Sequence, residues 1–150
     1  MLNKVVPNDE LIQEICKIIH DGTDVVFRTK GMSMLPFIIG GKDSVLLHKV
    51  DVIAIGDIVL AKVGGNRFVL HRVESVIGDT IILMGDGNIK GRERCKESDI
   101  LAVAVKIIKG QREIDCRSSK HLFRARIWRR LLPVRRYLLA FYKRIILWEK

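Results

Sequence analysis

The chain has 150 residues, of which 48% are hydrophobic, and it carries a formal net charge of +10. This length and apolar content predict one compact domain with its own core and exclude a disordered chain. Three cysteines without paired spacing argue against a disulfide framework and a zinc site, and no uncharged apolar run reaches the roughly 18 residues that a membrane-spanning helix needs.

The basic charge is concentrated at the C-terminal end. Residues 1–116 contain 16 basic and 16 acidic side chains, whereas residues 117–150 contain 11 basic side chains and a single acidic one, Glu149. The N-terminal segment has neither the basic region nor the long apolar stretch of a signal peptide. We therefore expect a cytoplasmic protein, peripheral at the inner membrane face if its basic segment binds lipid.

The periodicity of apolar residues divides the chain into three segments. Residues 1–23 contain an amphipathic pattern that predicts a helix at 8–20. Residues 24–116 change to short alternating runs, and the Gly-containing sequences at 64–66 and 78–79 are typical of hairpin turns. The fold class is therefore mainly β (α+β), a small antiparallel β-domain with an N-terminal helix. The predicted strands lie at 24–29, 44–50, 57–63, 67–76, 80–84 and 100–108.

Residues 117–150 form the third segment and predict two amphipathic basic helices that are interrupted at Pro133. Arginines are expected on one side, and aromatic residues among aliphatic ones on the other. Such helices can lie on an anionic membrane surface, which is our expectation here. Packing against the β-domain and contact between copies in a homo-oligomer are the alternatives. Nucleic acid is disfavoured, because the 32 residues before Ser33 leave no room for a helix-turn-helix beside a strand.

The main candidate for chemistry is the serine in the sequence Gly-Met-Ser-Met-Leu-Pro at residues 31–36. A serine hydroxyl is a poor nucleophile until a neighbouring base takes its proton, and His71 lies in a strand-like run at 68–73. We expect Ser33 to be the nucleophile and His71 its general base. Taken alone, the Gly-x-Ser-Met-x-Pro string is more typical of a serine in a solvent-facing turn than of a nucleophile.

Four short sequences in a fixed order strengthen this interpretation. Residues 31–36 are followed by Gly-Asp-Ile-Val at 56–59, Leu-His-Arg-Val at 70–73 and Gly-Asp-Gly-Asn at 85–88. Over about residues 24–108 this set resembles the S24/S26 serine peptidase group, which joins type I signal peptidases to the self-cleaving repressors of the SOS response. The His-Arg-Val sequence is similar to the histidine type, where histidine replaces the more usual lysine base. The resemblance implies the same small β-domain and an acyl-transfer mechanism.

The resemblance also implies roles for further residues. In histidine-type enzymes an acid in or just after the fourth sequence orients the histidine, which makes Asp86 the first candidate and Glu93 the second. A turn aspartate that caps local backbone is the alternative for Asp86. Backbone amides near Ser33 would hold the oxyanion. The residues expected to bind substrate are Gly31, Met32, Met34 and Pro36. For at least half of the apolar residues that follow Ser33, a place in the core is the alternative.

The sequence therefore favours a serine endopeptidase that cleaves a peptide or precursor protein near the membrane. An extended substrate could add as a strand beside residues 25–29. The alternative is a catalytically inactive adaptor with the same fold, which binds a peptide or a membrane. No cofactor and no metal ion are predicted.

Overall fold

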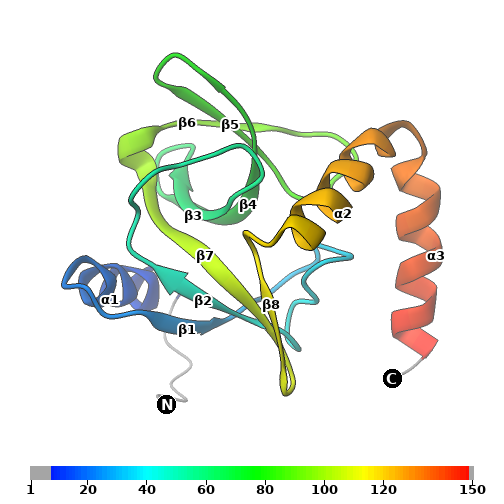
Figure 1. Cartoon of the computed structure of the whole chain (residues 1–150), viewed down its shortest axis with the longest axis horizontal. Coiled ribbons are helices and arrows are strands. Elements are labelled where there is room, and N and C mark those ends of the chain that lie inside the picture. Colours follow the sequence, from blue (N-terminus) through cyan, green and yellow to red (C-terminus); the bar gives the residue numbers. More distant parts are fainter. Residues whose placement is uncertain (1–7, 149–150) are drawn as a thin grey trace.

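The computed structural model describes residues 8–148. Residues 1–7 and 149–150, which belong to the predicted N-terminal and tail segments, lie outside the described residues. The described residues begin with a helix, continue through the strands of the β-domain and end with two helices joined by a short 3₁₀ turn (Figure 1). The elements are α1 (Asn8–His20), β1 (Val25–Arg28), β2 (Ser44–His48), β3 (Ile58–Val63), β4 (Arg67–Ile77), β5 (Thr80–Met84), β6 (Glu93–Lys96), η1 (Glu97–Asp99), β7 (Ile100–Lys109), β8 (Arg112–Asp115), α2 (Ser119–Arg130), η2 (Leu132–Val134) and α3 (Arg135–Trp148).

The strands form one antiparallel sheet in the order β1-β2-β7-β3-β4-β5-β6, and β8 pairs with β7. The predicted mainly β (α+β) class is confirmed, as are the helix at 8–20 and the six predicted strands within a few residues of their ends. β6 and β8 were not predicted. Each has only four residues, three of them charged, so neither shows the apolar alternation by which a strand is recognised.

The core lies on both faces of the central strand β3. Alternate residues of a strand point to opposite faces, and β3 divides its side chains in this way. Ile58 and Leu60 belong to one buried cluster, whereas Val59, Ala61 and Val63 belong to the other. Ile12, Ile15 and Ile19 of α1 pack into the first cluster, whereas Ile18 is exposed. Burial on both faces fixes β3 and its partner β4, the strand that carries His71.

The C-terminal helices pack back onto the β-domain, on the side away from α1 (Figure 1). His121, Arg135 and Leu139 are buried against it. The indole Nε1 of Trp128 donates a hydrogen bond of 2.7 Å to the carbonyl of Asp86, and Arg135 donates one of 3.0 Å to the carbonyl of Asn88. The helices thereby contact the loop that contains the Gly-Asp-Gly-Asn sequence at 85–88.

Burial along these helices does not follow residue type. Arg135 is buried, while aromatic and aliphatic side chains are exposed. No helix within residues 8–148 combines the length and the hydropathy needed to cross a membrane. The exposed apolar side chains of α2, η2 and α3 are Phe123, Ile127, Val134, Tyr137, Leu138, Phe141, Ile145, Leu147 and Trp148.

Candidate active site

Ser33 lies in the loop after β1, and hydrogen bonds close this loop at its base. Thr29 donates from its amide (3.1 Å) and from its hydroxyl (2.9 Å) to the carbonyl of Asp43. The carboxylate of Asp43 accepts a 2.8 Å hydrogen bond from the amide of Ile39 and pairs with Lys109. Asp43 is almost fully buried. One aspartate thus joins the two ends of the loop and ties it to β7.

The loop of residues 85–88 supports Ser33 through direct backbone contact. The amide of Gly87 donates a 2.8 Å hydrogen bond to the carbonyl of Ser33. A Cβ atom on Gly87 would lie 2.3 Å from the carbonyl oxygen of Met32, and one on Gly85 would lie 2.3 Å from that of Ser33. Only glycine permits such a close backbone approach. These two glycines therefore position the turn that carries the serine.

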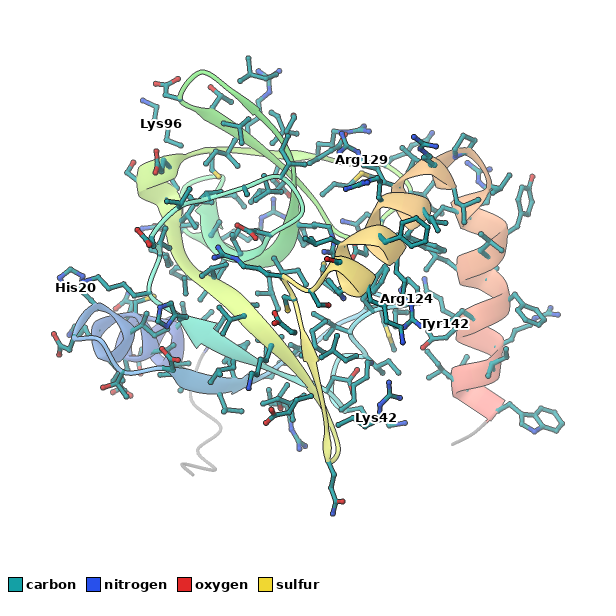
Figure 2. The ribbon with its side chains drawn as sticks, in the orientation of Figure 1. His20, Lys42, Lys96, Arg124, Arg129 and Tyr142 are labelled. Carbon is teal, nitrogen blue, oxygen red and sulfur yellow. The ribbon has the colours of Figure 1, made fainter. Side chains whose placement is uncertain are left out.

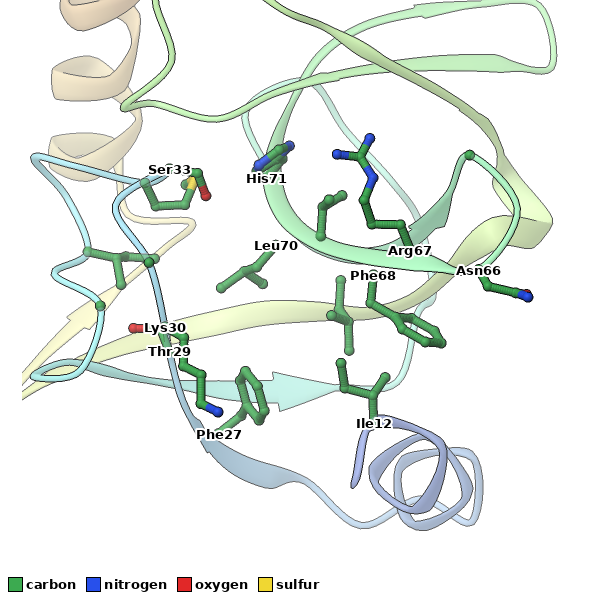
Figure 3. Close-up of a pocket in the computed structure, with 17 residues that line it drawn as sticks. Ile12, Phe27, Thr29, Lys30, Ser33, Asn66, Arg67, Phe68, Leu70 and His71 are labelled. Atoms are coloured by element: carbon green, nitrogen blue, oxygen red, sulfur yellow. The ribbon is translucent and has the colours of Figure 1, made fainter. Parts of the chain in front are cut away.

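Ser33 and His71 line the same pocket, whose volume is about 610 Å³. In Figure 3 the two side chains lie in the same part of the view, Ser33 on the loop and His71 on β4, and both line the pocket. Of the four residues predicted to bind substrate, Gly31 and Met34 line this pocket. Met32 is exposed outside its lining, and the carbonyl of Pro36 faces the hydroxyl of Tyr142 on α3, at 3.5 Å.

His71 is buried, and its burial lowers the pKa of the imidazole below the usual 6.5, although the negative charge of Glu93 opposes this shift. The ring is therefore neutral at pH 7 and can accept a proton. Its Nδ1 atom is buried and has no hydrogen-bond partner within residues 8–148. A group that orients the ring from this side is thus absent from the described residues.

Asp86 and Glu93, the two acids considered as the group that orients His71, are both bound to arginines. The carboxylate of Asp86 accepts hydrogen bonds from Arg72 Nε (2.9 and 3.1 Å) and from Arg72 Nη2 (2.7 Å), and both side chains are buried. Glu93 pairs with Arg67 at the start of β4. Neither carboxylate hydrogen-bonds to His71. Asp86 instead connects the loop of residues 85–88 to the residue that follows His71.

Arg72 also makes contacts beyond its ion pair. Its Nη1 donates to the carbonyl of Gly56 (2.9 Å) and lies 3.3 Å from Nε2 of His121 on α2. A guanidinium only donates, so this nitrogen of His121 accepts. Burial and the charge of Arg72 lower the pKa of His121 to about 4, which keeps the imidazole neutral in this contact. Arg72 therefore joins β4, the Gly-Asp-Ile-Val sequence at 56–59 and α2.

Sequence reasoning missed several residues that build the site. Asp43 follows Gly40 and Gly41, and an acid just after a Gly-Gly turn is a usable signal for a side chain that caps the loop. Arg72 was noted only as part of the His-Arg-Val sequence. Trp128 and Arg135 carried no signal, because helical periodicity does not tell which surface a helix contacts.

Comparison with known proteins identifies a family. The sequence model of the family described as "Peptidase S24-like" matches residues 4–108, a range that includes the predicted resemblance over 24–108. The predicted relationship to the S24/S26 group is thereby confirmed at the level of the family. No curated protein matches the chain.

The glycine contacts generate a first prediction. Gly87→Ala places a methyl group against the carbonyl of Met32, so the turn that carries Ser33 must shift, and we expect a loss of stability of about 1–3 kcal/mol. Urea denaturation measures this change. Gly110→Ala, in the β7–β8 turn, is the control: its φ of +63° is strained for alanine, but the new Cβ meets no atom within 4 Å. Equal losses in the two variants would contradict a specific role of Gly87.

Proposed function

Because the chain belongs to the Peptidase S24-like family, we propose that it is a serine endopeptidase with Ser33 as nucleophile and His71 as general base. The observation that carries this proposal is the convergence of the two side chains on one pocket from separate elements. A loop serine and a strand histidine, 38 positions apart in the sequence, thus line one pocket.

The chemistry follows from the neutral state of His71. As the Oγ of Ser33 attacks the carbonyl carbon of a peptide bond, His71 takes the hydroxyl proton. It then gives this proton to the leaving amine when the C–N bond breaks, which leaves an acyl-enzyme on Ser33. His71 next accepts a proton from a water molecule that attacks the ester, and it returns the proton to Ser33 as the carboxylic acid leaves.

The oxyanion of the tetrahedral intermediate requires hydrogen-bond donors near Ser33. In residues 8–148, the turn hydrogen bonds around this serine are donated by the amides of Leu35, Phe37, Ile38 and Gly87, and none by the amides of Ser33 or Met34. Those two amides are therefore the best candidates for the oxyanion hole. Removal of one such donor typically lowers the rate about 10²–10³-fold, so the contact of Gly87 with the turn also matters for the chemistry.

Two open strand edges favour an extended peptide as substrate. Among residues 8–148, β1 pairs only with β2, so no described strand covers its other edge. β4 pairs with β5 only from Arg72 onward, so within the same range residues 67–71 have no partner strand on that side. Residues from both segments line the pocket of Ser33, as Phe27 and Phe68 show in Figure 3. A peptide could therefore pair with one edge or both and present its carbonyl to Ser33.

A catalytically inactive adaptor remains the second candidate, and a specific observation favours it. His71 has no partner at Nδ1 within the described residues, and the two nearby acids are held by arginines. A histidine without an orienting group is a weaker base than one in a full triad. The open strand edges would serve a peptide-binding adaptor equally well.

Substitution of the dyad distinguishes these two functions. We expect the wild-type protein to cleave members of a diverse peptide library, and Ser33→Ala and His71→Ala each to lower kcat/KM at least about 10³-fold, because the two residues act as a unit. Mass spectrometry identifies the products. Ser75→Ala, on the same strand as His71, is the control and should retain activity. Cleavage that survives in Ser33→Ala would refute the mechanism, and intact peptides with every variant would support the adaptor.

The pH dependence provides an independent prediction. The base must be neutral, so kcat/KM should fall as the pH drops through the pKa of His71, with a midpoint below 6.5. The negative charge of Glu93 raises this pKa, so Glu93→Gln should move the midpoint to lower pH. Glu113→Gln, which removes a carboxylate paired with Lys106 on β7, is the matched control. A midpoint above 6.5, or equal shifts in both variants, would contradict the assignment.

We further propose that residues 117–150 hold the enzyme on an anionic membrane surface. α3 exposes Tyr137, Phe141 and Trp148, which recur at helical spacing and therefore share one face. The segment as a whole carries 11 basic residues and one acidic residue. Aromatic side chains insert at the interface between headgroups and acyl chains, while Lys and Arg bind the anionic headgroups.

Point variants test this placement better than truncation, because Trp128 and Arg135 support the loop of residues 85–88. We expect Phe141→Ser combined with Trp148→Ser to weaken co-sedimentation with anionic liposomes at least about tenfold, since each lost apolar contact contributes roughly 1.5–3 kcal/mol. Val52→Ser combined with Ile77→Ser removes two exposed apolar side chains elsewhere and is the control. Equal binding by both double variants, or equal binding to neutral liposomes, would refute the proposal.

A further inference from the structure

A second pocket, of about 390 Å³, lies between the sheet and α2. Five arginines contribute to its lining, together with two carboxylates. Arg72 is paired with Asp86, and Arg92 is paired with Glu74 at 2.9 Å, so both carboxylates are already neutralised. The pocket therefore has an excess of three positive charges, which belong to Arg126, Arg129 and Arg135.

Arg126 and Arg129 lie one turn apart on α2 and are exposed. Neither has an ion-pair partner within residues 8–148. Figure 2 shows Arg129 and Arg124 on different sides of α2, and only Arg129 belongs to the lining of the pocket. The two free guanidinium groups are thus placed together at one wall of a cavity.

Arg135 forms another part of this lining and is buried to 3% exposure. Its Nη1 donates to the carbonyl of Asn88 and its Nη2 to that of Trp128 (3.3 Å), and its guanidinium lies 5.2 Å from the indole centroid. The Nε atom is buried and has no partner within the described residues. A buried charged group with an unused donor is costly unless an anion compensates it.

We propose that this pocket binds a phosphate group. Guanidinium groups present paired donors that match phosphate oxygens. Within residues 8–148, three of the arginines around this cavity form no ion pair with a carboxylate. The volume suits a small ligand rather than a bare ion. Leu122, Met84 and Leu132 supply apolar surface for the organic part of a phosphate ester.

The pocket is separate from the one that contains Ser33 and His71, but it adjoins the same support. Asp86 and Arg135 both line it, and both belong to the contacts that hold residues 85–88. A phosphate that bridges α2 and Arg135 would stabilise the docked helices on this loop. The ligand would thereby favour the arrangement in which Gly87 holds the turn of Ser33.

The experiment measures binding to the full chain that carries Ser33→Ala, so that its result does not depend on peptidase activity. Inorganic phosphate and glycerol 3-phosphate are titrated at constant ionic strength and followed by calorimetry. A second arm uses liposomes with phosphatidic acid, compared with liposomes that carry the same charge as phosphatidylserine. The test variant combines Arg126→Gln with Arg129→Gln. The control combines Arg124→Gln with Arg130→Gln, which removes two charges from α2 outside the pocket.

We expect saturable binding that weakens at least about tenfold in the test variant and less than about threefold in the control, because charge-assisted hydrogen bonds are lost only in the first. If the test variant loses binding of the soluble phosphates, the ligand is a free phosphate ester. If it loses only binding to phosphatidic acid liposomes, the ligand is a lipid headgroup. Either result supports the site. No saturable binding in either arm, or equal weakening of the two double variants, overturns it.

Discussion

The buried ion pair between Arg72 and Asp86 is the interaction on which the arrangement of the site depends. Arg72 directly follows His71 on β4, and Asp86 lies in the loop whose Gly87 binds the carbonyl of Ser33. The pair makes two-pronged, charge-assisted hydrogen bonds, which fix orientation as well as distance. It therefore relates the strand that carries His71 to the turn that carries Ser33. Loss of one partner would leave a buried charge, at a cost of about 3–5 kcal/mol.

The same ion pair explains why the C-terminal helices belong to the site rather than to a separate tail. His121 accepts from Arg72, Trp128 donates to the carbonyl of Asp86, and Arg135 donates to that of Asn88. Each contact satisfies a buried polar group of the loop or of Arg72. The family match ends at residue 108, so these contacts come from a segment beyond the matched region. The two C-terminal helices thus support the site from outside the region that the family model matches.

The sequence predicted the elements whose signal is local, and it missed those whose signal depends on tertiary contact. The helix at 8–20 and the strands β1 to β5 and β7 follow from periodicity and turn residues. The convergence of Ser33 and His71 on one pocket was anticipated from the order of four short sequences. The binding of Asp86 by Arg72 was not, because an acid between two glycines gives no information about its partner. The burial of Arg135 was not predicted either, since a buried arginine is rare and the sequence offers no sign of the carbonyls that accept its hydrogen bonds.

Burial and nearby negative charge act in opposite directions on the pKa of His71, the general base of the proposed mechanism. A carboxylate bonded to the ring would orient it and stabilise the imidazolium, and it would raise the pKa. Here burial dominates and lowers the pKa of His71, with Glu93 opposing from its pair with Arg67. The ring is thus kept ready to accept a proton, but the cation that forms gains little stabilisation from its surroundings. In the proposed mechanism, such a site depends more on the placement of its nucleophile than on the strength of its base, so the glycines and the ion pair behind Ser33 would matter for activity as well as for stability.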